Sequence, residues 1–303
     1  MLGAAYQVLW WQTVFVSEIA NFLQLQTVVG HLSWDRFYQM NKILIVATLT
    51  LVSCSNHKNQ ENFNYRILGH GKPTIVIDLA MGETLLSWDT LQTTLSQLTT
   101  VVTYDRLGLG KSDSTNVPRT IENLSNDLNE FLSKNKIPGP YLFIGHSLGT
   151  SIIRKYQNDH PGNVLGMILV DPMHEDQFDK LMAIKSKEEQ EKTLRDRADF
   201  EKTLTTGERN EAILYHQQRA AMRDVKFVNS MPITIIGSFQ VGHGATEEDR
   251  KIKKELFDQW LNQAPQIKLI ATIKSGHYIQ DSEPELLIDE VKLMIEKLRP
   301  EQR

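Results

Sequence analysis

The sequence has a single cysteine, few charges near its start and no excess of basic residues. Cys54 is the one cysteine among 303 residues, which excludes an intrachain disulfide framework and a metal cluster held by several thiolates. The 33 Lys and Arg residues are outnumbered by 37 Asp and Glu residues, so the charge gives no basis for nucleic-acid binding. With 41% apolar and 23% charged residues, the composition is that of an ordinary globular protein.

Residues 1–39 carry three charges, Glu18, Asp35 and Arg36, and their apolar stretches are interrupted by polar side chains. A membrane-spanning helix needs about 20 mostly apolar residues, so this region does not predict one. The pattern changes at Met40. A lysine follows, and the apolar run Ile43–Leu51 then has the length of a signal-peptide core.

Residues 40–54 resemble a bacterial lipoprotein signal peptide, which is cleaved before a cysteine that becomes lipidated. The resemblance implies a signal at 40–53, a lipidated Cys54, a tether at 54–62 and attachment to the lipid bilayer of the cell envelope. Because such signals stand at the start of a chain, we interpret Met40 as the translation start and residues 1–39 as an incorrectly assigned upstream extension. If the signal is not used, we expect a cytoplasmic protein.

From residue 63 to residue 303, strand-like and helix-like segments alternate, which is typical of a parallel sheet with crossover helices. The β-branched runs indicate strands that are buried on both faces. The expected strands are Thr74–Asp78, Val101–Tyr104, Tyr141–Ile144, Met167–Val170, Ile233–Ile236 and Ile267–Ile273. The expected helices are Thr120–Asn135, Leu148–His160, Glu247–Asn262 and Glu285–Leu298.

The composition shifts in residues 176–230. From Asp176 to Arg223 the chain is rich in charged residues and glutamine, has no proline and contains no strand-like run. This pattern predicts two or three amphipathic helices inserted between strands. A solvated helical face explains the charges, and the scattered apolar side chains are able to face inward over a cleft.

Gly145-His146-Ser147-Leu148-Gly149 matches the G-x-S-x-G pattern of a nucleophile elbow. An apolar strand precedes it and a helix-like segment follows, which is the context that the pattern requires. The glycines allow the strand and the helix to approach closely at a strained turn. We therefore interpret Ser147 as a nucleophile.

A nucleophilic serine needs a base, and His277 is the candidate. It lies in Ser275-Gly276-His277, just after the last predicted strand, where catalytic groups gather in open α/β sheets. It also follows Ser147 in the chain, as in the order serine, acid, histidine. The remaining histidines fall outside the domain, at a helix end, in the charged insertion or within the elbow.

The chain resembles the α/β-hydrolases of the serine esterase and peptidase-like branch. Besides the elbow, Asp105-Arg106-Leu107-Gly108-Leu109-Gly110-Lys111-Ser112 matches their D-R-x-G-x-G-x-S loop, Met167–Asp171 their sixth strand, and Gly276-His277 their terminal histidine loop. The resemblance implies an α/β fold with a mostly parallel eight-stranded sheet flanked by helices. It also implies a helical cap at 176–230 between strands six and seven, and hydrolysis through an acyl-enzyme.

The oxyanion hole is expected at the backbone amides of Met81 and Leu148. Leu148 follows the nucleophile, and Met81 lies in the loop after the first long strand. This loop reads Leu79-Ala80-Met81-Gly82 where family members often carry His-Gly. Because backbone N–H groups are the donors, the side chains there can vary.

The acid is the least determined member of the site. Most family members place an aspartate after strand seven, but here no carboxylate precedes Glu247. Some take the acid from the end of strand six, which is the position of Asp171. The alternatives are a carboxylate within Glu247–Asp249, meaning Glu247 or Asp249 above all, and Glu175 or Asp176.

No cofactor or metal is expected, because H-E-x-x-H is absent and His174-Glu175-Asp176 cannot easily converge on one ion. The sequence therefore predicts a serine hydrolase that acts on a small-molecule ester or related acyl substrate. Two alternatives remain open: an aminopeptidase or amide hydrolase, and a catalytically silent binding protein on the same fold.

Overall fold

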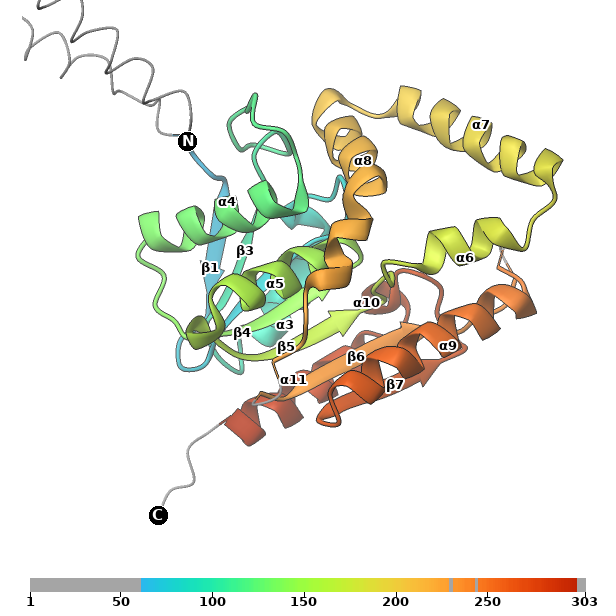
Figure 1. The fold of residues 1–303 in the computed structure, drawn as a ribbon. Coiled ribbons are helices and arrows are strands. Elements are labelled where there is room, and N and C mark those ends of the chain that lie inside the picture. The colour runs from blue at the N-terminus through green and yellow to red at the C-terminus, as the bar shows by residue number, and fades with distance from the viewer. Residues whose placement is uncertain (1–60, 229–230, 243–244, 299–303) are drawn as a thin grey trace, which may run out of the picture. The chain divides into compact units, whose positions relative to one another are not determined.

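The computed structural model describes residues 61–228, 231–242 and 245–298, and a seven-stranded sheet lies at its centre (Figure 1). The strands are β1 (Tyr65–Leu68), β2 (Thr74–Asp78), β3 (Val101–Tyr104), β4 (Tyr141–His146), β5 (Val164–Val170), β6 (Ile233–Ser238) and β7 (Ile267–Thr272). Their order is β1-β3-β2-β4-β5-β6-β7, and only β1 runs antiparallel to its neighbour. The expected extension at 1–39, the signal at 40–53, Cys54 and most of the tether lie outside the described residues.

The central strands are buried on both faces because their side chains alternate between two apolar clusters. In β2, Ile75 and Ile77 join one cluster and Val76 joins the other. The same alternation recurs in β4, where Phe143 lies between Leu142 and Ile144 on the opposite face. The continuous apolar runs in the sequence reflect this burial.

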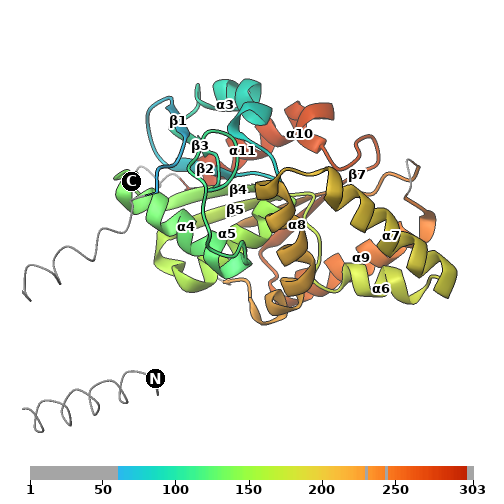
Figure 2. The same cartoon turned by 90° about the horizontal axis from the view of Figure 1, so that it is seen from above.

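Helices cover both faces of the sheet (Figure 2). On one side lie α4 (Ile121–Lys134), α5 (Leu148–Asp159) and α9 (Glu247–Gln263), and on the other lie α3 (Asp89–Leu95) and α11 (Pro284–Leu298). The short elements are η1 (Leu85–Trp88), η2 (Pro161–Asn163) and α10 (Ile279–Ser282). Among the described residues, no helix combines the length and apolar character that a membrane crossing requires.

Four helical elements separate β5 from β6: α6 (Gln177–Ala183), α7 (Lys187–Thr203), α8 (Thr206–Gln218) and η3 (Arg219–Asp224). We call Gln177–Asp224 the insertion. Helix α7 buries none of its residues, whereas α8 buries Glu211 and Ala212. Figure 1 shows these helices beyond the carboxyl ends of the strands, where the elbow also lies. The part of the insertion that packs on the sheet is therefore α8.

The α/β fold class is confirmed, but two elements escaped the sequence prediction. Strand β1 is an edge strand of four residues that buries none of them, so it lacks the apolar run of a central strand. Helix α3 spans seven residues, too few for a clear helical period. With β1 included the described sheet has seven strands, and the expected count of eight is not confirmed.

Candidate active site

Ser147 lies at a sharp turn between β4 and α5. Its backbone has φ 50° and ψ −114°, a left-handed conformation that costs a non-glycine residue about 1–3 kcal/mol. The turn is held by the sheet, because the Ser147 N–H donates to the carbonyl of Val170 at 3.1 Å. Gly149 allows the approach: a Cβ there would lie 2.2 Å from the carbonyl oxygen of Asp78. The sequence context of a nucleophile elbow is thus present in the fold.

His277 and Asp171 form the closest acid–base contact at this edge of the sheet. The Nδ1 of His277 lies 2.7 Å from Oδ2 of Asp171. Asp171 directly follows β5 and its N–H donates to the carbonyl of Ile236 in β6 at 2.7 Å. Its carboxylate is 7% exposed, while the imidazole is 44% exposed. A buried carboxylate therefore orients an accessible ring.

The second oxygen of Asp171 is occupied as well. Its Oδ1 accepts hydrogen bonds from the Ser238 N–H at 2.8 Å and from Nζ of Lys253 at 2.6 Å. Burial alone would raise the pKa of Asp171, but the hydrogen bond from His277 and the charge of Lys253 outweigh burial and lower it below the ordinary value. The acid is thus ionised throughout the neutral range.

The other carboxylates considered as the acid have different partners, and none makes a polar contact with His277 within the described residues. Glu247 pairs with Arg250, Asp249 accepts from the N–H and hydroxyl of Thr246, Glu175 pairs with Arg154, and Asp176 pairs with Arg223. Glu247, Asp249 and Thr246 together stabilise the N-terminus of α9. Only Asp171 is brought to the imidazole.

The loop after β2 presents one free amide beside two occupied ones. The Ala80 N–H donates to Oε2 of Glu83 at 3.0 Å, and the Gly82 N–H donates to Oε2 of Glu211 at 3.0 Å. Within the described part of the chain, the amides of Met81 and Leu148 make no hydrogen bond. These two are the donors that the sequence indicated for an oxyanion.

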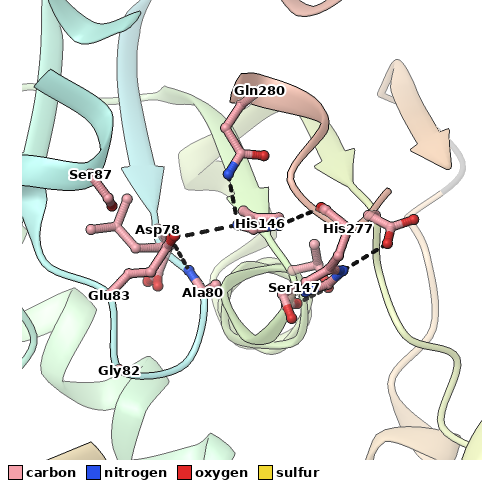
Figure 3. A network of polar contacts seen from close by, with 12 residues as sticks. Asp78, Ala80, Gly82, Glu83, Ser87, His146, Ser147, His277 and Gln280 are labelled. Atoms are coloured by element: carbon pink, nitrogen blue, oxygen red, sulfur yellow. Dashed lines mark hydrogen bonds and ion pairs between the residues drawn. The ribbon is translucent and has the colours of Figure 1, made fainter. Parts of the chain in front are cut away.

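His146, which precedes the nucleophile, ties three loops together (Figure 3). Its Nε2 lies 3.0 Å from the carbonyl oxygen of His277, and because a carbonyl only accepts, Nε2 carries the hydrogen. Its Nδ1 lies 3.3 Å from Nε2 of Gln280 and 3.5 Å from Oε2 of Glu83. His146 therefore connects the histidine loop to the loop after β2, directly beside Ser147.

A cavity of about 280 Å³ lies beside the imidazole of His277. Its lining includes Asp171, Phe239, Gln240 and Lys253, so it combines an aromatic wall with polar groups. In the described segments, no group of three or more His, Cys, Asp or Glu side chains is arranged to hold a metal ion. The groups gathered here are those of nucleophilic and acid–base chemistry.

The family model described as "alpha/beta hydrolase fold" matches residues 69–244. This match covers more than half of the chain and includes the elbow. The chain belongs to the alpha/beta hydrolase fold family.

Two curated relatives match parts of this α/β-hydrolase. The uncharacterised protein YqjL of Bacillus subtilis (strain 168) is 28% identical over 125 residues, which cover 41% of this chain and 47% of the relative. An AB hydrolase superfamily protein of Gibberella zeae is 30% identical over 115 residues, which cover 37% of this chain and 36% of the relative. The chain thus spans less than half the length of either relative.

Solved structures resemble this α/β-hydrolase over most of its length. A thermophilic esterase from Thermogutta terrifontis, with malate bound, has a TM-score of 0.60 at 15% identity, covering 81% of this chain and 97% of that one. The esterase EaEST from Exiguobacterium antarcticum has a TM-score of 0.60 at 16% identity, covering 79% and 97%. The epoxide hydrolase CorEH has a TM-score of 0.59 at 16% identity, covering 80% and 97%. At such identities the likeness shows the shared fold.

Sequence reasoning missed Lys253, Glu83 and Glu211 as members of this α/β-hydrolase site. Lys253 is one of several cationic residues in α9, and its neighbour Lys254 pairs with Asp258 on the exposed side. Glu211 belongs to an insertion whose charges read as a solvated face. No local pattern separates these residues from exposed charges. The weak signal for Glu83 is its place in the loop that carries Met81.

Proposed function

We propose that this α/β-hydrolase is a serine hydrolase that cleaves a carboxylic ester or related acyl bond of a small molecule. The observation that carries the proposal is the 2.7 Å contact between His277 Nδ1 and the buried carboxylate of Asp171, next to a serine on a strained elbow. A carboxylate that holds Nδ1 leaves Nε2 of the same ring available to take a proton from a serine hydroxyl.

The proposed reaction has two steps. The Oγ of Ser147 bonds to the acyl carbon as its proton passes to Nε2 of His277, and that proton then goes to the leaving alcohol as the ester C–O bond breaks. A water molecule deprotonated by His277 next attacks the acyl-enzyme, which releases the acid and restores the Ser147 hydroxyl. Asp171 stabilises the imidazolium that forms in both steps.

The tetrahedral oxyanion is assigned to the amides of Met81 and Leu148. Their support is that both lack an acceptor within the described residues, while the flanking amides of Ala80 and Gly82 are occupied. Loss of one such donor typically costs a factor of about 10²–10³ in rate. In this proposal the insertion serves as the cap that selects the substrate.

Labelling with a fluorophosphonate probe tests the proposal, with wild type compared to Ser147→Ala. We expect labelling and turnover of short p-nitrophenyl esters in the wild type only. Parallel assays with p-nitroanilides separate ester from amide cleavage. A folded wild-type protein without Ser147-dependent labelling would contradict the hydrolase proposal and favour the silent binding protein.

We further propose that the enzyme works at the cell envelope, attached to a lipid bilayer through a lipidated Cys54. The support is the sequence pattern at 40–54. Metabolic labelling with an alkyne fatty acid in a bacterial host tests this proposal, with Cys54→Ala as the control. Recovery of an unmodified chain that continues through Cys54 would refute it.

A further inference from the structure

Arg106 is buried at the back of the candidate oxyanion loop and uses every donor it has. Its Nε and Nη2 donate to the two oxygens of Glu211 at 2.7 and 2.8 Å. Its Nη1 donates to Asp78 and to the carbonyl of Leu79, both at 2.8 Å, and Nη2 also donates to the carbonyl of Ala80 at 2.7 Å. These five bonds account for the five N–H groups of a guanidinium.

The loop that carries Met81 is therefore fixed on both sides. Before Met81, the carbonyls of Leu79 and Ala80 are held by Arg106. After it, the Gly82 N–H donates to the same Glu211 oxygen that accepts from Arg106 Nη2. Met81 lies between these anchors, so the direction of its N–H depends on both.

One of the two anchors comes from the insertion. Glu211 lies on α8, 129 residues after Gly82 in the chain, and its side chain is only 1% exposed. Burying a carboxylate is costly unless it is paired and hydrogen-bonded. Here the cost is offset by Arg106 and Gly82, and the carboxylate connects the insertion to the core.

The insertion approaches the core most closely one turn earlier on the same helix. A Cβ at Gly207 would lie 2.0 Å from the carbonyl oxygen of Gly108. Residues four apart lie on the same face of an α-helix, so Gly207 and Glu211 face the core together. A change at Gly207 would displace Glu211 without altering any group of the hydrogen-bonded network.

We propose that Glu211 is a positioning residue for the oxyanion hole, so that the insertion orients the Met81 amide as well as covering the site. This inference rests on the proposed function. Glu211 does not reach the reacting atoms; it acts through Gly82 and Arg106. Its loss affects the transition state, in which the oxyanion forms, more than the bound ester.

The test compares Glu211→Gln with wild type in ester hydrolysis. The amide retains the shape of the carboxylate, but its NH₂ group cannot accept from the Gly82 N–H or from Arg106. We expect kcat to fall about 10- to 100-fold while KM changes less than about threefold. The Ki of an aryl trifluoromethyl ketone, whose adduct with serine carries an oxyanion, rises by the same factor as kcat/KM falls. Glu188→Gln, on the exposed first turn of α7, makes the same charge change and leaves kcat as in wild type.

Gly207→Ala provides a second route to the same displacement and decides the question if Glu211→Gln does not fold. We expect it to lower kcat and weaken the ketone in parallel, at an unchanged extent of labelling by the fluorophosphonate. A folded variant of either kind with wild-type kcat and wild-type Ki overturns the inference. The failure of the proposed function has a different signature, because the wild type itself would then show no Ser147-dependent turnover.

Discussion

The ammonium of Lys253 lies 2.6 Å from Oδ1 of Asp171, and this carboxylate holds the imidazole of His277 through its other oxygen, Oδ2. Lys253 is 13% exposed and lies 5.7 and 5.5 Å from the ring centroids of Phe239 and Phe257. The acid behind the candidate base is therefore shared between two cationic partners whenever the imidazole is protonated.

Replacing Lys253 by methionine should move the pH profile of the enzyme. Without the ammonium, the full negative charge of Asp171 acts on the ring, which favours the protonated ring and postpones its action as a base. We expect the acid limb of kcat/KM to move toward higher pH by about one pH unit. Lys254→Met, next to it on the exposed side of α9, is the matched control. A lower kcat with an unmoved limb would indicate that Lys253 only supports the fold.

Asp171→Asn should reduce kcat by a factor of about 10⁴, because the amide presents an N–H or a weak acceptor to Nδ1 and no longer stabilises the imidazolium. Single-turnover ester hydrolysis measures the loss, and circular dichroism verifies the fold. Asp176→Asn serves as the comparison, since Asp176 was an alternative acid and pairs with Arg223 instead. Near-normal turnover by a folded Asp171→Asn variant would exclude Asp171 as the acid.

His216 in α8 gives the stability of the protein a defined pH dependence. Burial and the nearby charges of Arg197 and Arg219 lower the pKa of His216 from 6.5 to about 4. Between these values the unfolded chain binds a proton that the folded chain does not, so stability falls as the pH drops from about 6.5 to about 4. We expect His216→Phe to remove a few degrees of this decline in Tm, and a substitution of the exposed His70 to leave it unchanged. The prediction is wrong if the two variants show the same slope of Tm against pH.

Gly149→Ala should damage both stability and activity. The added Cβ would lie 2.2 Å from the carbonyl oxygen of Asp78, so α5 must shift away from the sheet at its first turn. We expect a loss of about 1–3 kcal/mol in the free energy of unfolding, measured by urea denaturation, and a lower kcat because the Leu148 amide moves with the helix. Gly162→Ala is the control, since nothing lies within 4 Å of a Cβ there. Equal stability of the two variants would show that α5 has room to move.

The sequence predicted those parts of the molecule that have a local signal. Six strands appear as apolar runs because both faces of each are buried, and Ser147 and His277 stand in short motifs at strand ends. Asp171 was indicated by its place after a buried strand, with alternatives that only spatial proximity to His277 separates. Edge strand β1, with no buried residue, gave no such signal.

Partners that are distant in the sequence could not be predicted. Lys253 is 82 residues from Asp171, and Glu211 is 129 residues from Gly82. A charged residue in an amphipathic helix looks the same in the sequence whether it faces water or a buried partner, because helical periodicity marks the apolar positions. The insertion therefore read as a solvated surface, although α8 contributes a carboxylate to the core.

The backbone bonds from Ser147 to Val170 and from Asp171 to Ile236 continue the pairing of β4 with β5 and of β5 with β6. The nucleophile and the acid are thus part of the most stable region of the fold, whereas His277 lies on a loop beyond β7, the last strand of the sheet. Local opening requires less free energy in such a loop than in central strands. On warming, the imidazole should lose its register with the serine before the sheet melts, so that inactivation precedes the loss of secondary structure and reverses on cooling.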